Sequence, residues 1–116
     1  MSARIRVSAA PYRTMDGIVF ASKAEMFRYA ELRMLERAGR IKDLELQPSY
    51  TLMEGYVRDG AKVRPIIYRA DFRYLDTKTS RIIVEDCKGF STEIFKLKKK
   101  MFLSKYPDIN FTEVKA

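Results

Sequence analysis

Residues 81–88, with the sequence RIIVEDCK, constrain the fold more than any other segment because an apolar run ends in a group of charges. The letters IIV are β-branched and predict a strand buried in the core. Side chains alternate between the two faces of a strand, so Asp86 and Lys88 share a face with the apolar start, and Glu85 points to the other face. Gly89 then interrupts the chain. The strand therefore brings an aspartate and a lysine together at its end.

A helix is predicted before this strand, from Ser22 to about Gly39. Ser22 followed by Glu25 three residues later is a capping box, which marks the start of a helix. Gly39 is suited to the position just after the last helical residue. Apolar residues at helical spacing predict a buried stripe made of Ala24, Phe27, Met34, Leu35 and Ala38.

Three strands in a meander are predicted over residues 50–88. The first begins near Tyr50, and Asp59-Gly60 is the signal of a tight hairpin turn. Residues 63–75, VRPIIYRADFRYL, form a single returning strand. Its side chains alternate, with Ile67, Arg69, Asp71 and Arg73 on one face and the apolar Tyr68, Ala70, Phe72 and Tyr74 on the other.

A second helix and a final strand are predicted after residue 90. Ser91 is the expected N-cap, the helix covers about residues 92–105, and Pro107 ends it. Residues 109–114, INFTEV, form the last strand, and a helix that connects two strands favours their parallel pairing. The buried stripe of this helix is predicted to contain Ile94, Leu97, Met101 and Phe102.

This order of elements predicts an α/β fold of the mixed α+β kind, in which helices flank a mixed central sheet. A chain of 116 residues has room for one core. We expect a basic N-terminal arm over residues 1–21 and a single domain over residues 22–116. No apolar run approaches the ~20 residues of a membrane span, and the N-terminus lacks the apolar stretch of a signal peptide. With one cysteine, a cytoplasmic protein is expected.

The chain carries a formal net charge of +8 and has no histidine. A small basic domain favours polyanionic partners, and nucleic acid first among them. Without histidine, Ser-His-Asp and Cys-His catalysis are excluded, and so is most zinc chemistry. An enzyme built from this sequence would depend on carboxylates, lysine, tyrosine, or a hard metal ion with oxygen ligands.

Asp71 and Asp86 are the candidate pair for such a metal ion. If Leu75 pairs with Arg81 or Ile82, Asp71 lies close to Asp86, although the register of two strands can slip by a residue or two. Two neighbouring carboxylates repel each other unless a cation lies between them, and Mg²⁺ suits that position. The alternative interpretation is that both aspartates form ordinary ion pairs with neighbouring lysine and arginine side chains.

This arrangement resembles the PD-(D/E)xK nuclease superfamily, which has the restriction-endonuclease-like fold. The matching pieces are YRADF with Asp71 and EDCKG with Asp86 and Lys88, and the superfamily core has the same αβββαβ order. Ala70 stands where the motif has proline, a departure that the superfamily tolerates. Glu25 matches an additional metal-associated glutamate on the first helix. Longer strings, such as SKAEMFRYAELRMLERAGRIKDLELQPSYTL, resemble a family of small phage and prophage proteins described as uncharacterised or as suggested endonucleases.

The resemblance implies a DNA endonuclease that depends on Mg²⁺ or Mn²⁺. Asp71, Asp86 and Glu25 would be catalytic metal ligands, and Lys88 would be the catalytic group that orients the attacking water. Recognition of DNA shape, such as a junction in recombination, is more plausible than base reading in so short a chain, and a junction resolvase calls for a symmetric homodimer. The alternative is a non-catalytic nucleic-acid-binding or phage assembly protein with the same fold.

Basic and polar residues outside this group are candidates for binding the DNA backbone. The first turns of the second helix present N–H groups that favour phosphate, although the lysines there are equally suited to a solvated face. The N-terminal arm is basic and can follow a phosphate backbone, and a glutamine near the first strand resembles one in related nucleases. The candidates are Thr92, Lys96, Lys99, Arg4, Arg6 and Gln47.

Overall fold

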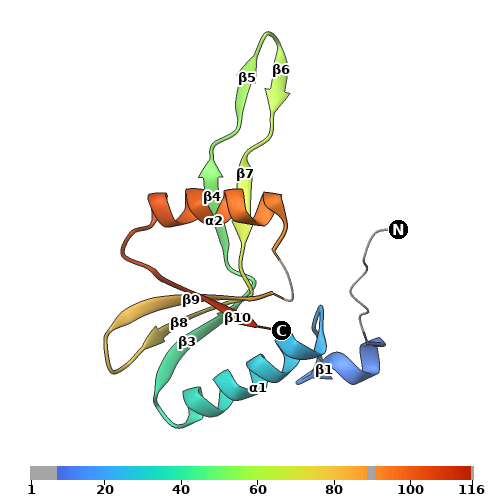
Figure 1. The fold of residues 1–116 in the computed structure, drawn as a ribbon, viewed down its shortest axis with the longest axis vertical. Helices are drawn as coiled ribbons and strands as arrows, with labels where there is room; N and C mark the ends of the chain where they lie inside the picture. Colours follow the sequence, from blue (N-terminus) through green and yellow to red (C-terminus); the bar gives the residue numbers. More distant parts are fainter. Residues whose placement is uncertain (1–7, 89–90, 116) are drawn as a thin grey trace.

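The protein is a mixed α/β domain built around a four-stranded sheet with the strand order β10-β9-β8-β3 (Figure 1). The computed structural model describes residues 8–88 and 91–115. Helices α1 and α2 lie on opposite sides of the sheet, which confirms the predicted fold class. The sheet consists of β3 (Ile41–Leu46), β8 (Phe72–Asp76), β9 (Arg81–Lys88) and β10 (Asn110–Lys115), and the helices are α1 (Lys23–Arg37) and α2 (Glu93–Lys105).

The pairing of β8, β9 and β10 follows the prediction. β8 and β9 are antiparallel, with Leu75 opposite Ile82 and Phe72 opposite Glu85. β9 and β10 are parallel, as expected for two strands that are joined through α2. Because the antiparallel ladder ends at Phe72 and Glu85, the next residue beyond each of them lies at the open end of the ladder.

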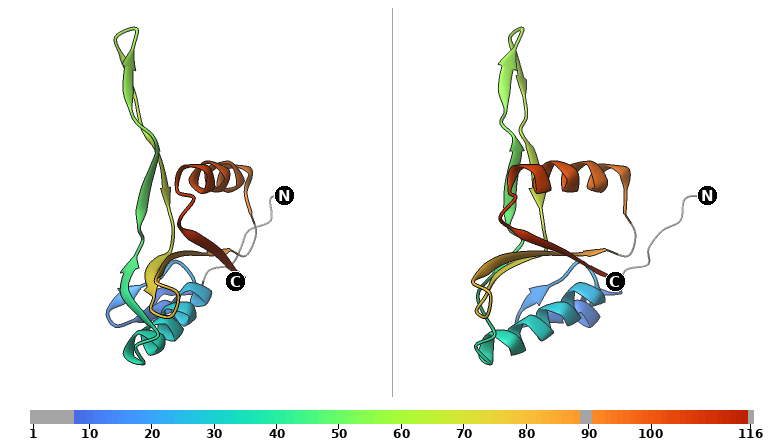
Figure 2. Two further views of the ribbon diagram at one scale, coloured as in Figure 1. Left: turned by 90° about the vertical axis from the view of Figure 1, so that its left-hand side faces the viewer. Right: turned by 60° about the vertical axis from the view of Figure 1, so that its left-hand side comes forward.

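A long two-stranded ribbon projects from the sheet beside α2 (Figure 2). Its turn is the predicted Asp59-Gly60 hairpin, with positive φ angles of 52° and 78°. Residues 54–62 are all exposed, and the molecule extends 53 Å along its longest axis. The ribbon consists of β4 (Ser49–Met53) paired with β7 (Ile66–Arg69), and β5 (Tyr56–Arg58) paired with β6 (Ala61–Val63).

Strand β3 is missing from the sequence prediction, which started the first strand near Tyr50. The sequence of β3, IKDLEL, contains three charged residues, and Asp43 has a positive φ of 57°. The register against β8 shifts between Lys42 and Glu45, so a bulge interrupts the alternation of side chains. The strand signal is therefore weak in the sequence, and the long-range pairing with β8 completes it.

The predicted single strand over residues 63–75 is wrong, because the chain breaks at Ala70 and Asp71. β7 pairs within the ribbon, whereas β8 belongs to the four-stranded sheet. The opposite strand breaks at the same level, at Gln47 and Pro48. Two backbone bonds of 3.0 Å hold this junction, from Gln47 N–H to the Asp71 carbonyl and from Ala70 N–H to the Pro48 carbonyl.

The same break divides the apolar face that was predicted for this strand. Tyr68 and Ala70 belong to the core cluster on the α2 side of the sheet. Phe72 and Tyr74 belong to the cluster on the α1 side. The backbone changes direction at this point, so the two apolar side chains before the break enter one core and the two after it enter the other.

Helix α1 begins and ends where it was predicted. Ser22 is the N-cap, and its hydroxyl accepts a 3.1 Å hydrogen bond from the backbone N–H of Glu25. Ala38 is the C-cap, and Gly39 follows it with a φ of 75°. A left-handed residue at this position favours glycine.

The predicted buried stripe of α1 is wrong in part: Leu35 is partly buried against the core, as predicted, but the stripe as a whole does not face the sheet. Phe27 and Met34 are 56% and 67% exposed, whereas Met26, Tyr29 and Leu32 are buried. Apolar residues occur around most of the helix circumference, so periodicity alone does not select a face. The sheet selects the face that carries Tyr29 and Leu32.

Helix α2 requires two corrections. Its N-cap is Thr92 instead of Ser91, and the Thr92 hydroxyl accepts a 3.1 Å bond from the backbone N–H of Phe95. Ile94 and Leu97 were predicted to be buried but are 68% and 58% exposed. Phe95 and Phe102, seven residues apart on one face, pack instead against Tyr68. The largest aromatic side chains therefore decide which face of α2 meets the sheet. Phe102 is buried and Met101 partly buried, in agreement with the predicted stripe.

Residues 8–21, the described part of the predicted N-terminal arm, fold beside α1. They form a 3₁₀ turn (Ala10–Arg13) and a short hairpin of β1 (Thr14–Met15) and β2 (Ile18–Val19). Phe20 is buried in the α1-side core. Arg4 and Arg6 lie outside the described residues. Within the described part of the chain, neither helix has the length and apolar character to cross a membrane.

Candidate active site

The two predicted aspartates meet where β8 and β9 cease to pair. The backbone N–H of Asp71 donates to the carbonyl of Glu85 at 3.0 Å. One residue further along β9, the backbone N–H of Cys87 donates to the Asp71 carboxylate, Oδ2, at 2.7 Å. The side chains of Asp71 and Asp86 are close enough for the charge of Asp86 to raise the pKa of Asp71. The side chain of Asp71 thus continues the ladder in place of a main-chain carbonyl and stands beside Asp86.

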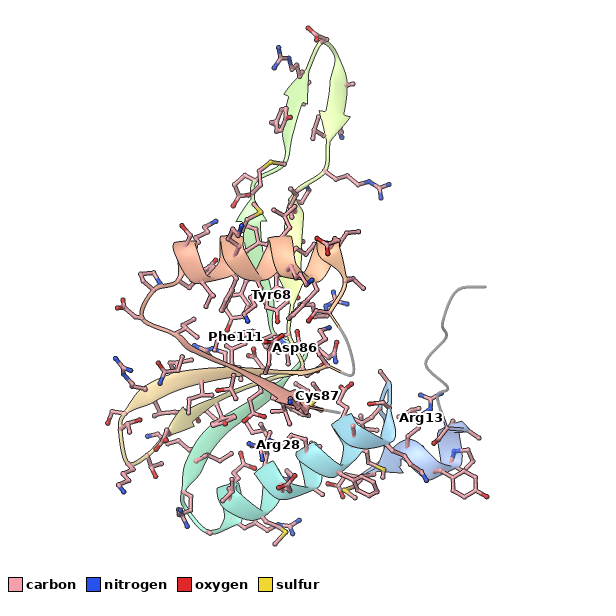
Figure 3. All side chains as sticks on the ribbon, in the orientation of Figure 1. Arg13, Arg28, Tyr68, Asp86, Cys87 and Phe111 are labelled. Carbon is pink, nitrogen blue, oxygen red and sulfur yellow. The ribbon has the colours of Figure 1, made fainter. Side chains whose placement is uncertain are left out.

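Asp86 is 1% exposed and lies between β9 and α2 (Figure 3). Its Oδ2 atom accepts a hydrogen bond from the hydroxyl of Tyr68. The Lys88 ammonium lies 3.2 Å from the other oxygen, Oδ1, as an ion pair. This contact lacks hydrogen-bonding alignment, so Oδ1 has no hydrogen-bond donor among the described residues. Buried polar atoms without a donor are rare, and this one is available to an external ligand.

Glu25 is the third carboxylate of the site and comes from the first turn of α1, where it is 6% exposed. Its Oε1 atom accepts a 3.2 Å hydrogen bond from Nε2 of Gln47. Gln47 lies at the break between β3 and β4, where its φ is 54°. The structure therefore places Gln47 as the partner of Glu25, and its backbone is bonded to Asp71.

Burial raises the pKa values of Asp71 and Glu25. The pKa of Asp71 is raised to about 7, chiefly because the group is buried and further because Asp86 and Glu25 are negative, against the opposing hydrogen bond from the N–H of Cys87. The pKa of Glu25 is also raised, first by burial and then by Asp86, while Gln47 and Lys88 oppose the rise. Carboxylates that repel one another in this way are stabilised by a cation between them.

The carboxylates of this site suit a hard divalent cation that needs only one or two protein ligands. No group of three or more Asp, Glu, Cys or His side chains that could hold a metal ion is found in residues 8–88 and 91–115. Mg²⁺, however, is commonly bound by one or two carboxylates and keeps water and substrate phosphate as its other ligands. Asp71 and Asp86, whose Oδ1 accepts no hydrogen bond among the described residues, meet this smaller requirement, and Glu25 is the nearby third carboxylate.

On the opposite face of β9, Glu85 forms an ion pair with Arg28 in which both carboxylate oxygens are hydrogen-bonded. Glu85 is 1% exposed, and its two oxygens accept hydrogen bonds of 2.7 Å from Nε and from a terminal nitrogen of Arg28 in α1. The hydroxyl of Tyr74 also donates to Glu85. Glu85 thus points away from Asp86, as alternation predicts, and is bonded to protein on every side.

Cys87 lies next to these residues without the properties of a nucleophile. Burial raises the pKa of its thiol to about 12, and the charges of Asp71 and Glu25 raise it further. A thiol with such a pKa stays protonated at neutral pH and is a poor nucleophile and metal ligand. The contribution of Cys87 to the site is therefore the hydrogen bond from its backbone N–H to Asp71.

The predicted phosphate contacts on α2 are spread over different surfaces. Lys96 forms an exposed 3.3 Å ion pair with Glu93. Lys99 forms a 3.0 Å ion pair with Glu113 on β10 and lies over the ring of Phe111. Thr92, the N-cap, lines a groove together with Lys88. Of these three predicted residues, Thr92 shares a groove with Lys88, whereas Lys96 and Lys99 are paired with glutamates.

The structure adds residues that the sequence analysis did not assign to the site. Arg28 and Tyr74 hold Glu85, and Tyr68 holds Asp86. Tyr68 and Tyr74 were interpreted as core residues, which they also are. Arg28 is separated by 57 residues from its partner, so no local pattern could reveal it. A signal did exist for Tyr68, because a tyrosine on a buried strand needs a partner for its hydroxyl.

The fold and the site define a small mixed α/β domain in which two aspartates and a lysine meet at the end of paired strands, with a glutamate from the first helix nearby. The chain belongs to the DUF1064 family, whose description is "Protein of unknown function", and the match covers residues 9–116. No match was found among curated proteins or among solved structures. The family assignment carries no activity, so the functional argument depends on the site itself.

Proposed function

We propose that this protein is a metal-dependent nuclease that hydrolyses phosphodiester bonds in DNA, as a member of the PD-(D/E)xK superfamily with a restriction-endonuclease-like core. The observation that carries the proposal is the meeting of Asp71 and Asp86 beside Lys88, with one buried Asp86 oxygen lacking a donor. The order of helix, strand meander, helix and parallel strand supports it. The net charge of +8 supports a polyanionic substrate.

In this proposal, Asp71 and Asp86 hold Mg²⁺ or Mn²⁺, and Glu25 contributes from α1. When bound, such an ion supplies a Lewis acid that acidifies water and offsets charge on the phosphoryl group. Lys88 is the only one of the four with a positive charge. Its ammonium is fixed by Asp86 at 3.2 Å and by the ring of Phe95, whose centre is 4.6 Å away.

The roles of the side chains follow from these contacts. Lys88 orients the attacking water and stabilises negative charge that develops on the phosphate oxygens. Tyr68 holds Asp86 in one orientation through its hydroxyl. Gln47 holds Glu25 in the same way. Fixed positions of this kind lower the reorganisation that the reaction requires.

The test is a cleavage assay with supercoiled plasmid, linear duplex and a four-way junction, each with Mg²⁺, Mn²⁺ or chelator. We expect nicking by the wild type only when metal is present. Asp86→Asn keeps the size of the side chain and should reduce the rate by about 100-fold or more, the loss typical of a preorganised electrostatic group. Asp108→Asn, at an exposed position before β10, is the matched control and should cleave like the wild type.

Substrate preference is the finer part of the proposal. A selective nuclease for branched DNA, active in phage recombination, should cut the junction faster than the linear duplex. Paired nicks in one junction would require a homodimer, which sedimentation with and without the junction would detect. Equal cleavage by Asp86→Asn and the wild type would contradict the whole mechanism.

A second candidate is a non-catalytic nucleic-acid-binding or phage assembly protein. It is favoured by the lack, among the described residues, of a ready group of three metal-binding side chains. This candidate predicts DNA binding without cleavage of any substrate in the panel. It also predicts that Mn²⁺ leaves the thermal unfolding midpoint unchanged, whereas a metal-binding site raises it by mass action.

A further inference from the structure

A groove of about 430 Å³ opens between the first turns of α2 and strand β7, directly beside Lys88. In Figures 1 and 2 this is the region where α2 crosses the base of the ribbon. Its basic lining consists of Lys88, Arg69 from β7 and Lys98 from α2. None of the described residues that line it is acidic. The groove therefore begins beside the candidate active site at Lys88, which is paired with Asp86, and carries the further positive charges of Arg69 and Lys98.

The positive charges of Arg69 and Lys98 in this groove differ from those of Lys96 and Lys99 in α2. Lys96 and Lys99 are each neutralised by a glutamate. Arg69 and Lys98 form no ion pair among the described residues. Lys98 instead donates a 2.9 Å hydrogen bond to the carbonyl of Ile67, which fixes its ammonium at the wall of the groove. An ammonium has three donors, so the others remain available to an anion.

The remaining walls of the groove suit the sugar and base that accompany a phosphate. Ile67 from β7 and Ile94 from α2, which are 41% and 68% exposed, both line the groove, and so does Phe95. The Thr92 hydroxyl caps α2 at one end of the groove. A basic floor with apolar side chains matches a nucleic-acid strand better than a small inorganic anion, which offers nothing to apolar walls.

We propose that this groove is a binding subsite for the DNA strand next to the scissile phosphate, in which Arg69 and Lys98 bind a neighbouring backbone phosphate. The inference rests on the proposed nuclease function for the position of the scissile phosphate. Lys88 connects the two places, since it contacts Asp86 on one side and lines the groove on the other. Arg69 offers a planar guanidinium suited to phosphate oxygens.

The test measures binding separately from cleavage. Affinity for a labelled DNA duplex is measured with chelator present over a series of salt concentrations for the wild type, Arg69→Gln, Lys98→Gln and the double variant. Arg37→Gln with Lys42→Gln removes the same charge from exposed positions near α1 and is the control. The thermal unfolding midpoint of each variant shows that it is folded.

The expected result is a loss of affinity of about 10- to 100-fold at 0.1 M salt for the double variant, with the salt slope reduced by about two. Each single variant should reduce the slope by about one, and the control should lose far less affinity. Equal affinity and slope in the folded double variant and the control would overturn the proposal. If the wild type cleaves no DNA but the groove variants still lose affinity, the nuclease assignment fails and the binding subsite stands.

Discussion

The two faces of strand β9 present neighbouring buried carboxylates in opposite conditions. Glu85 and Asp86 are each 1% exposed. Glu85, facing α1, is bonded by both nitrogens of the Arg28 fork and by the hydroxyl of Tyr74. Asp86, facing α2, has one hydrogen bond from Tyr68 and an oxygen without a donor. On one face of the strand both carboxylate oxygens are hydrogen-bonded within the chain, and on the other face one carboxylate oxygen is not hydrogen-bonded to any described residue.

This difference separates a carboxylate that is fully hydrogen-bonded within the chain from one that is a candidate for binding a ligand. A buried carboxylate needs partners that replace its lost water. Glu85 has them within the chain, so nothing further is required of it. Asp86 has a hydrogen bond from Tyr68 and an ion pair with Lys88, but its Oδ1 accepts no hydrogen bond among the described residues. The pKa of its neighbour Asp71 is raised to about 7. A bound cation would offset the unfavourable free energy of these neighbouring buried carboxylates. Groups with strongly shifted pKa values are common at functional sites.

The largest expected effect is the loss of the ion pair between Glu85 and Arg28. Glu85→Ala should lower the free energy of unfolding by about 3–5 kcal/mol, because Arg28 is left without its buried partner. Urea denaturation measures the loss. Glu31→Ala removes the other, exposed partner of Arg28, at 3.6 Å, and should cost less than about 1 kcal/mol. Similar losses in both variants would mean that Glu85 is not the residue that anchors α1 to β9.

The second effect concerns Asp71 on the other face, where a substitution is expected to raise the free energy of unfolding instead of lowering it. The pKa of Asp71 is higher in the folded protein than its ordinary value of 3.8, so the stability of the metal-free protein falls as pH rises from about 4 to 7. Asp71→Asn keeps an acceptor for the N–H of Cys87 and cannot ionise. It should raise the free energy of unfolding at pH 8 by about 1–3 kcal/mol, since solvent screening reduces the full effect of the shift.

The measurement is a set of denaturation curves from pH 4 to pH 8 without metal. The advantage of Asp71→Asn should be absent at pH 4 and complete above pH 7. Adding Mn²⁺ at pH 8 should stabilise the wild type and leave the variant unchanged, which removes the difference between them. A variant that is less stable than the wild type at pH 8 would show that Asp71 is a structural ion-pair partner.

The smallest expected effect compares the two tyrosines. Tyr74→Phe leaves Glu85 with Arg28 and should cost about 0.5–1.5 kcal/mol, the value of an ordinary hydrogen bond. Tyr68→Phe removes the hydrogen-bond donor of Asp86 and should cost about 1 kcal/mol more, because a buried charge is then unsatisfied. Parallel urea titrations at pH 8 give the difference. Equal losses of unfolding free energy in the two variants would contradict the proposed difference between the two faces of β9.

Much of the fold and the core of the site could be predicted from local patterns. The Ser22 cap and the Asp59-Gly60 turn depend on residues close together in the chain. Alternation along β9 separated Asp86 from Glu85, and the pairing of Leu75 with Ile82 placed Asp71 beside Asp86. These features were accessible because each follows from a fixed periodicity or a short-range hydrogen bond.

Other features could not be predicted because they depend on contacts between distant segments. Phe27 and Leu32 are both apolar residues of α1, yet only Leu32 is buried. The break at Ala70 and Asp71 contains no glycine or proline that would signal it in the sequence. It lies opposite the break at Gln47 and Pro48, to which it is joined by backbone hydrogen bonds. Propensity and periodicity describe one segment at a time and do not contain this information.

The sequence by itself determined the order of the elements, the basic charge, the absence of histidine chemistry and the face of β9 on which Asp86 and Lys88 lie. Only the tertiary structure decided which carboxylates are satisfied. Arg28 reaches Glu85 across 57 residues and bonds both of its oxygens, whereas Oδ1 of Asp86 has the ion-pair contact of Lys88 but accepts no hydrogen bond among the described residues. Whether a buried charge is structural or open to a ligand depends on the donors that the fold brings to it, which no stretch of sequence specifies alone.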